Sequence, residues 1–380
     1  METEAFMNGP GTVDDYDGLP CYRPASLPPD ITYTDDLLRV YGDAQYALGR
    51  LATLHRNVEN QNLLIAPFVV REAAMSSQIE GTNVTVSDII LHDIDTTPTR
   101  SAADSLDIRE AYNYVDAIRQ GFDRLDTGAT FSVDLICTLH DTLLSDVRGV
   151  DEHPGTLRDV PVYIGSPNGS PETARFIPAN PDIVPVLLEQ LVSYMNRGQY
   201  PTLIDVALTH YQFETIHPCR DGNGRLGRVL MMLQLYTAGM LPEPYLYLSA
   251  YFNRHRQQYL DGLLAVSRDG AWEEWTVFVL NAIAEQAIDA YDCAQQLQTI
   301  RADYRRRFPN RPAVRDVVDY LFEAPYLTAP RAIEATGRSR QAVYDAIEAL
   351  ETEDIVVAIS DSERYRVYEV PDILNIVTSP

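Results

Sequence analysis

The sequence contains no lysine, since all 30 of its basic residues are arginine, against 55 aspartate and glutamate residues. The resulting net charge of −25 fits an acidic surface that keeps a protein in solution. The complete loss of lysine beside so many acids is more typical of a protein from a salt-loving (halophilic) cell, where salt screens the self-repulsion.

Cysteine is scarce, and long apolar runs are missing. The four cysteines are Cys21, Cys137, Cys219 and Cys293. They lie far apart with no CxxC pair, which argues against a zinc site and a disulfide framework. The first residues have neither the basic region nor the apolar run of a signal peptide. The longest apolar stretch, 229–241, is too short and too mixed to span a bilayer. We therefore expect a cytoplasmic protein with no membrane partner.

The chain length of 380 residues suggests two or three domains. Residues 1–35 are rich in proline, glycine and aspartate, which predicts an irregular arm. Residues 36–305 show helical periodicity in most windows. An exception at about 153–181 has many turn residues around a short β-like run, 160–164. This pattern predicts a short β-hairpin, or flap, inserted into a helical domain.

The last part of the chain, 306–380, has a different pattern. The basic, proline-containing stretch RADYRRRFPNRP (301–312) predicts a connector between domains. Three short helices are expected at 313–322, 329–335 and 340–350. Two strands around a polar turn then follow in DIVVAISDSERYRVYEV. Three helices and a hairpin predict a small α+β winged helix-turn-helix domain, so the whole fold is expected to be mainly α.

The winged helix-turn-helix pattern raises the question of DNA binding. Gly337 would lie in the turn, and Arg338 and Arg340 would open the recognition helix, where DNA contacts are made. Residues 311–380, however, hold 7 arginines and 13 acids, a net charge of −6. This is a poor electrostatic match for DNA. DNA binding through residues 311–370, docking of a protein partner and formation of a homodimer all stay open.

The most informative stretch is HYQFETIHPCRDGNGRLGRVLMML. Apolar residues at positions 226, 229, 230 and 233 predict a buried helix that starts near Asn223. Gly222 and Gly224 flank Asn223 and let backbone N–H groups turn inward as an anion nest. Because the nest sits at a positive helix N-terminus, it suits a phosphate group.

Charged residues around this nest also suit a nucleotide. Arg225 and Arg228 lie three apart on the helix, and the planar guanidinium donates paired hydrogen bonds to phosphate oxygens. Asp221 can hold Mg²⁺ between phosphates. His217 can act as a general base near neutral pH. Each residue alone has an ordinary structural explanation, but all of them at this spacing indicate a nucleotide site.

The stretch HPCRDGNGRLGR resembles the signature HPFx(D/E)GNGRxxR of the Fic (Fido) family. The resemblance covers about residues 40–300. It implies an all-helical core and a protein adenylyltransferase, which transfers AMP from ATP to a Ser, Thr or Tyr hydroxyl of a target protein or of itself. By this resemblance His217 deprotonates the hydroxyl and Asp221 binds Mg²⁺. Gly222, Asn223 and Gly224 hold phosphates beside Arg225. Arg228 takes the γ-phosphate, and Tyr259 lines the adenine pocket.

The sequence departs from this signature at Cys219, where the family has phenylalanine. A smaller side chain would leave the catalytic loop, 217–228, less firmly anchored in the core. A nucleophilic role for Cys219 stays open because His217 is close in sequence. A buried, inert thiol is the commoner case.

The predicted flap lies where proteins of the family carry a flap that aligns the target protein. By that resemblance a target segment would pair as an added strand along the run formed by Val160, Val162, Tyr163 and Ile164. A surface hairpin without such a role is the alternative.

A carboxylate stands where a helix would favour a cation. The stretch SSQIEG ends a helix expected at about 67–80, which Gly81 stops, and the C-terminus of a helix carries partial negative charge. Ser76, Glu80 and Gly81 fit the family's inhibitory pattern (S/T)xxxE(G/N). The resemblance implies that Glu80 pairs with Arg228 and that Ser76 helps to fix the helix, so that ATP binds only in an unreactive pose. An unpaired, solvated glutamate is the alternative.

Two other functions remain open at this point. The helical domain would serve a DNA-binding transcriptional regulator if it only sensed nucleotide. The same site would remove AMP from a modified protein if it worked in reverse. The sequence does not exclude UMP or GMP as the transferred group.

Overall fold

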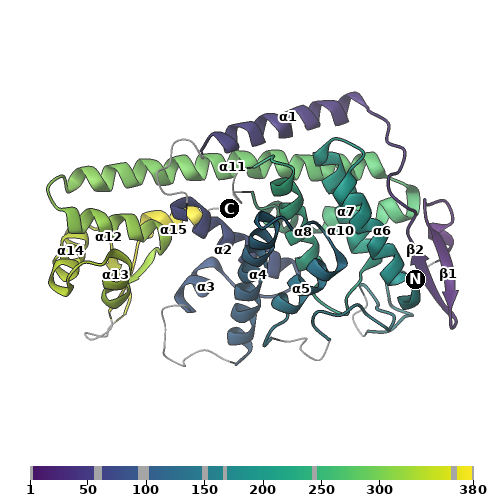
Figure 1. The fold of residues 1–380 in the computed structure, drawn as a ribbon, viewed down its shortest axis with the longest axis horizontal. Helices are drawn as coiled ribbons and strands as arrows, with labels where there is room; N and C mark the ends of the chain where they lie inside the picture. The colour runs from purple at the N-terminus through teal and green to yellow at the C-terminus, as the bar shows by residue number, and fades with distance from the viewer. Residues whose placement is uncertain are drawn as a thin grey trace.

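The computed structural model describes residues 3–54, 62–92, 102–147, 153–165, 169–241, 246–360 and 366–378. Helices dominate (Figure 1). In chain order they are α1 (Asp35–Ala52), α2 (Asn62–Ile79), α3 (Val86–His92), α4 (Ala102–Asp126), α5 (Val133–Leu143), α6 (Val184–Arg197), α7 (Thr202–Ile216), α8 (Asn223–Thr237), α9 (Ser249–Arg254), α10 (Arg256–Asp269), α11 (Trp272–Arg307), α12 (Pro312–Glu323), α13 (Ala329–Thr336), α14 (Arg340–Thr352) and α15 (Pro371–Thr378).

The sheets are small. One holds β1 (Thr12–Tyr16) and β2 (Leu19–Arg23), and the other holds β3 (Tyr326–Thr328), β4 (Val357–Ala358) and β5 (Val367–Glu369). The mainly α fold predicted from the periodicity is confirmed. None of the described helices is both long and apolar enough to cross a bilayer.

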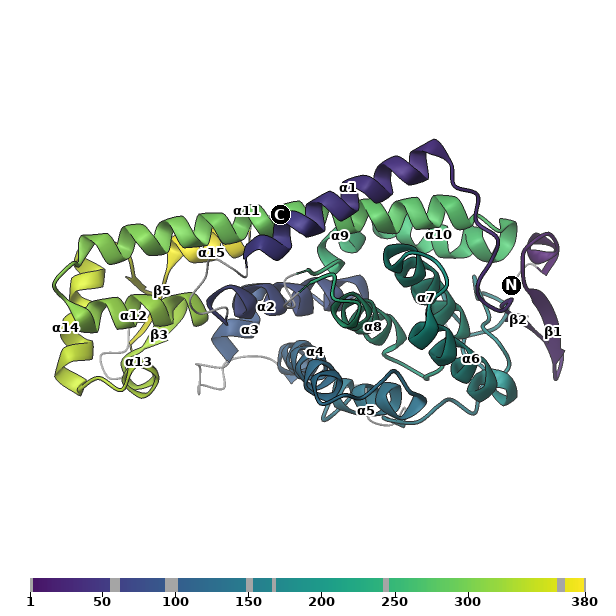
Figure 2. The ribbon, with the colours of Figure 1, turned by 45° about the horizontal axis from the view of Figure 1, so that its top comes forward.

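Helices α7 and α8 form the centre of the molecule. Almost all residues of both helices are buried, as expected for helices that are apolar around most of their circumference. Other helices lie around them in both views (Figures 1 and 2). The loop at 217–222 that joins them is therefore attached at both ends to buried helices.

The long helix α11 runs along one side of the molecule, with α1 packed against it (Figure 2). The sequence predicted a connector at 301–312, which is wrong for Arg301–Arg307, because these residues continue α11. Arg301 and Arg305 both pair with Asp319 of α12, at 2.9 and 2.8 Å, which holds the last turns of α11 against α12.

The C-terminal part contains the three expected helices as α12, α13 and α14. Strand β5 pairs antiparallel with both β3 and β4, and a further helix, α15, follows. The predicted polar turn falls at 361–365, outside the described residues. Helices α12 and α15 pack against α2, so this part touches the helix that was expected to be inhibitory.

The N-terminal arm is not irregular throughout, because β1 and β2 form an antiparallel hairpin. Its turn places Asp17 and Gly18 at φ of 49° and 81°. Asp-Gly is a preferred pair for such a two-residue turn, so the sequence did carry this signal. The hairpin packs on the flap, where the Tyr22 N–H donates to the Ile177 carbonyl at 2.8 Å.

The predicted flap hairpin is reduced to one bridge. Ile164 pairs with Phe176, and the described parts of the flap, 153–165 and 169–181, contain no strand. Pro161 has no N–H to donate to a ladder. Gly165 turns the chain directly after the bridge with a φ of 69°. Residues 166–168 of the flap lie outside the described residues.

Trp275 should be a main determinant of stability. It is buried among the rings of His210, Tyr259 and Phe278, and its indole N–H donates to the Ala207 carbonyl at 2.8 Å. Trp275→Ala should lower the free energy of unfolding by about 3–5 kcal/mol, measured by urea denaturation. The control Tyr46→Ala, on the exposed face of α1, should stay within about 0.5 kcal/mol. Equal losses for both variants would contradict this assignment.

Candidate active site

The loop between α7 and α8 has a tightly defined backbone. His217 caps α7 in the left-handed conformation, with a φ of 51°. Gly222 precedes α8 at a φ of 76°, where a side chain would be strained. The carboxylate of Asp221 accepts a hydrogen bond from the Gly222 N–H at 2.6 Å. The predicted glycine-rich turn therefore opens α8 as expected.

Asn223 fixes the loop through its side chain. Its amide accepts from the Cys219 N–H and donates to the Cys219 carbonyl, both at 2.9 Å. The side chain of Asn223 thus closes the loop on itself. Cys219 itself is buried in the core, and burial raises the pKa of its thiol, which makes it an inert packing residue. With these two bonds, the loop is held in place despite the small side chain.

Arg158, which the sequence reasoning missed, holds the same loop from the flap side. Its guanidinium donates to the carbonyls of Ile216, His217 and Ala179, and its backbone N–H donates to the Pro218 carbonyl at 2.9 Å. The side chain is almost fully buried. No periodicity or spacing marks a lone arginine whose partners are backbone carbonyls, most of them far away in the chain.

His140 of α5 is a second missed support. The Gly155 N–H donates to its Nδ1, so the proton is on Nε2, which donates to the Asp221 carbonyl at 3.0 Å. Burial lowers the pKa of His140, in keeping with a neutral ring. The loop thus has buried partners on both sides.

His217 is placed as a base. Its Nδ1 donates to the Glu214 carbonyl at 3.2 Å, which leaves the lone pair on Nε2. Burial, aided by the positive charge of Arg158, lowers the pKa of His217 to about 4. The imidazole is therefore neutral at physiological pH and able to accept a proton.

Arg228 and Glu80 form the ion pair that the sequence predicted. The guanidinium donates to Glu80 Oε1 at 2.7 Å and, through Nε, to the Ser76 hydroxyl at 2.9 Å. The Arg228 side chain is 1% exposed and that of Glu80 40%. Burial raises the pKa of Glu80, but Arg228 outweighs this effect, so the pKa lies below its ordinary value.

The Glu80 carboxylate also covers the start of α8. A Cβ added at Gly224 would lie 2.3 Å from Glu80 Oε1, so only glycine leaves room for the carboxylate there. An anion at a helix N-terminus is favourable. Glu80 therefore occupies the place that suits a phosphate oxygen.

Arg256, also missed, meets the end of α2. Its guanidinium donates to the Ile79 carbonyl at 3.0 Å, which supplies the cation that a helix C-terminus favours. Asn253 donates to Gln78 at 2.9 Å in the same turn. Gly81 follows with a φ of 101° and ends the helix. The last turn of α2 is thus tied to α9 and α10 as well as to α8.

Arg225 pairs with a different acid from Arg228. It bonds Glu110 of α4 at 3.1 Å and lies 3.9 Å from Asp221. Glu110 had no signal in the sequence. Through this contact Arg225 ties α8 to α4 and lies beside the metal-binding candidate.

Asp221 is the candidate for Mg²⁺. Among the described residues no group of three or more His, Cys, Asp or Glu side chains forms a metal cluster. Mg²⁺ needs no such cluster, because it keeps waters and commonly binds one or two carboxylates together with substrate phosphates. The Asp221 side chain is 51% exposed, so its donor set fits an ion that arrives with a nucleotide.

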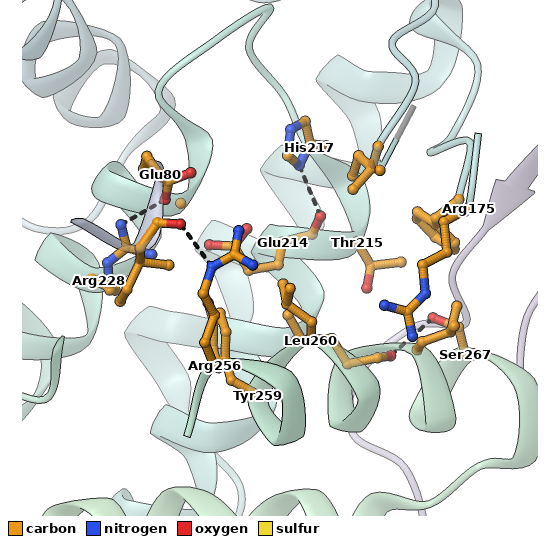
Figure 3. Close-up of a pocket in the computed structure, with 17 residues that line it drawn as sticks. Glu80, Arg175, Glu214, Thr215, His217, Arg228, Arg256, Tyr259, Leu260 and Ser267 are labelled. Carbon is orange, nitrogen blue, oxygen red and sulfur yellow. Dashed lines mark hydrogen bonds and ion pairs between the residues drawn. The ribbon is translucent and has the colours of Figure 1, made fainter. Parts of the chain in front are cut away.

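A cavity of about 330 Å³ lies beside these residues (Figure 3). Glu80, His217 and Arg228 line its polar side. Of the predicted residues it brings together Glu80, His217, Gly224, Arg228, Tyr259 and Ile164; Ser76, Gly81, Val160, Val162, Tyr163, Asp221, Gly222, Asn223 and Arg225 lie outside its lining.

The other side of the cavity is apolar and comes from the flap and α10, with Ile164, Phe176, Leu260 and Leu263. Tyr259 lines it as well, and its hydroxyl bonds His210 Nε2 at 2.8 Å. Apolar walls with a few polar groups are typical of small-molecule sites.

Comparisons with known proteins agree with this geometry. Residues 38–123 match the model of the Fic/DOC family N-terminal region, and residues 130–235 match that of the Fic/DOC family. The chain is 31% identical to protein adenylyltransferase fic-1 of Caenorhabditis elegans over 114 residues, which are 29% of this chain and 20% of that protein. It is 32% identical to a probable protein adenylyltransferase of Aquifex aeolicus over 91 residues, 24% of this chain and 26% of that one. The matched part thus spans between a fifth and about a quarter of the length of these two relatives.

The fold has counterparts among solved structures. A Fic family protein from Desulfovibrio desulfuricans superposes with a TM-score of 0.59 at 18% identity and covers 90% of this chain and 98% of its own. The two family matches follow one another along the helical body and include the loop and α8. The chain therefore belongs to the Fic/DOC family.

Proposed function

We propose that the protein is an adenylyltransferase that transfers AMP from ATP to a hydroxyl group of a protein, and that Glu80 keeps it inactive by default. The main support is the pair of contacts made by Glu80, on Arg228 and over Gly224. The carboxylate takes both positions that a terminal phosphate would use. The family matches and the names of the relatives support the same reaction.

The residues of this chain are suited to that chemistry. His217 Nε2 takes the proton of the target hydroxyl as its oxygen attacks the α-phosphorus of ATP. The new oxygen–phosphorus bond forms while the bond to pyrophosphate breaks, and pyrophosphate carries away the electron pair. The N–H groups at the start of α8 and the guanidinium of Arg228 hold the phosphates for this in-line attack. Positioning and charge neutralisation supply most of the rate.

Mg²⁺ is expected to enter with ATP. Asp221 would hold the ion, and the positive charge of the nearby Arg225 would help to balance the negative charge of the phosphates. When bound, the ion neutralises phosphate charge. The nucleotide base would lie on the apolar side of the cavity next to Tyr259, and AMP is the group we expect to be transferred.

The target would be a Ser, Thr or Tyr hydroxyl, on another protein or on this one. Its segment would lie along the flap at Val160, Val162 and Tyr163, next to the cavity wall formed by Ile164. Val160 is 41% exposed, so this edge is open to a partner. Added-strand pairing needs only such an extended edge.

DNA binding is the weaker alternative. Arg338 already pairs with Asp316, and Arg340 stacks on Tyr344. The outer face of α14 also exposes Asp345 and Glu348. These acids would repel DNA phosphates, so docking of a protein partner suits α14 better.

Removing the brake should raise activity. Glu80→Gly frees Arg228 from a charged hydrogen bond worth about 1.5–3 kcal/mol, which corresponds to about a ten- to hundredfold gain in labelling rate. Intact-mass measurement after incubation with Mg-ATP would detect addition of AMP to the protein or to a lysate target. Arg228→Ala should abolish labelling with and without the Glu80 substitution. No labelling by Glu80→Gly under any condition would refute the transferase.

His217 should be needed for transfer but not for ATP binding. In the Glu80→Gly background, His217→Ala should lower the labelling rate by about 10²–10⁴-fold, while calorimetry still detects ATP binding. Because its pKa is about 4, the base form is complete above pH 6, so on this account the rate falls only as pH approaches that pKa. A rate that declined already between pH 7 and 6 would argue against His217 as the base.

Arg256 should strengthen the brake by holding the end of α2. Arg256→Ala should raise labelling severalfold in the otherwise wild-type protein and add nothing in the Glu80→Gly background. Arg254→Ala, which removes an exposed pair with Glu285 and a cation–π contact with Tyr251, is the matched control and should change neither rate. If Arg256→Ala instead lowers labelling in the Glu80→Gly background, Arg256 binds the nucleotide.

A further inference from the structure

The cavity contains a second carboxyl group that the reaction above does not use. Glu214 lies in the last turn of α7, and its side chain lines the cavity together with His217 and Arg228 (Figure 3). Its Oε1 is buried and has no hydrogen-bond partner among the described residues. A buried polar atom of this kind costs free energy unless something in the functional state satisfies it.

The surroundings of Glu214 are crowded. A Cβ added at Gly227 would lie 2.4 Å from its Oε1, so the glycine in α8 makes room for the carboxyl. Charged and titratable groups face it from each neighbouring element: Arg228 of α8, Glu80 after α2, Arg256 and Tyr259 of α10, and His210 and His217 of α7 and its cap. No arginine or histidine of the described residues forms an ion pair with it, so it is not a structural counter-ion.

The charge of the ligand decides which form of Glu214 the cavity can use. A carboxylate between Arg228 and His217 would face the phosphates of a nucleotide and repel them, since like charges in a cavity of low dielectric interact strongly. A neutral carboxylic acid is not repelled by the phosphates and has an O–H that it can donate to them. The same logic keeps a carboxylic acid protonated in other buried sites.

We infer that Glu214 is a positioning residue that works as a neutral acid: its O–H donates a hydrogen bond to an oxygen of the bound nucleotide, and loss of its proton weakens nucleotide binding. The inference rests on the proposed nucleotide-dependent function. Burial raises the pKa of Glu214 to about 8, with Arg228 opposing the effect and Glu80 adding to it. The acid form therefore predominates at neutral pH and is lost as pH rises above this value.

The neighbouring groups do not titrate in the same window. Burial lowers the pKa of His217 to about 4 and that of His210 to about 3, and it raises the pKa of Tyr259 well above its ordinary value. Between pH 7 and pH 9 Glu214 is thus the group facing this part of the cavity that changes charge. A change in nucleotide affinity over that range can be assigned to it.

The test is calorimetric titration of the Glu80→Gly protein with Mg-ATP at pH 7, 8 and 9. If only the protonated form binds, the Kd should weaken by about tenfold from pH 7 to 9 for a pKa of about 8, because about one molecule in ten still carries the proton one unit above the pKa. The Glu80→Gly substitution removes a charge that raises this pKa, so the loss over the same range should be larger still. Glu80→Gly/Glu214→Gln, which stays neutral and keeps a donor, should show no such change. Glu80→Gly/Glu214→Ala should bind more weakly at pH 7 and also lose the pH dependence.

Two outcomes would overturn the inference. One is a Kd that is constant from pH 7 to 9 in Glu80→Gly alone, a measurement that leaves Glu214 intact and so does not depend on the folding of a variant. The other is the same decline in the Glu214→Gln protein. Because binding rather than labelling is read out, a protein that binds ATP with this pH profile but never transfers AMP would refute the proposed function and leave the role of Glu214 standing.

Discussion

The ion pair between Glu80 and Arg228 is the interaction on which the arrangement of the site depends. It joins the end of α2 to the buried face of α8, two segments far apart in the chain, and Ser76 and Arg256 hold the two sides of it. Arg228 is buried, and a buried guanidinium must keep an anionic partner. In the structure this partner is Glu80. On the proposed function a phosphate would replace it, so the same arginine would connect nucleotide binding to inhibition.

Buried hydrogen bonds make the neighbouring loop rigid enough for this exchange. Arg158 and His140 hold loop carbonyls from opposite sides, and Asn223 closes the loop on Cys219. Their partners are backbone atoms, so the loop geometry does not depend on the ligand. Preorganisation of this kind would let positioning and electrostatics supply most of the rate of the proposed transfer.

The sequence predicted best what is local. The residues from His217 to Arg228 lie in one short stretch of chain. Helical periodicity located α7 and α8, the two helices that this stretch connects. The contacts of Arg158 and Glu110 join segments that no spacing relates, and nothing in their residue type distinguishes them from surface charges. The flap was overestimated because proline removes ladder donors, whereas the hairpin at Asp17 and Gly18 was missed although its turn signal was present.

We propose that Glu80 inhibits by charge, as a competitor of the terminal phosphate for Arg228. The labelling rate of Glu80→Gln with Mg-ATP, measured by intact mass, tests this most directly, because glutamine keeps the size of the side chain and removes its charge. We expect a rate well above that of the wild type and close to that of Glu80→Gly. A rate equal to that of the wild type would contradict it and show that Glu80 inhibits by its bulk.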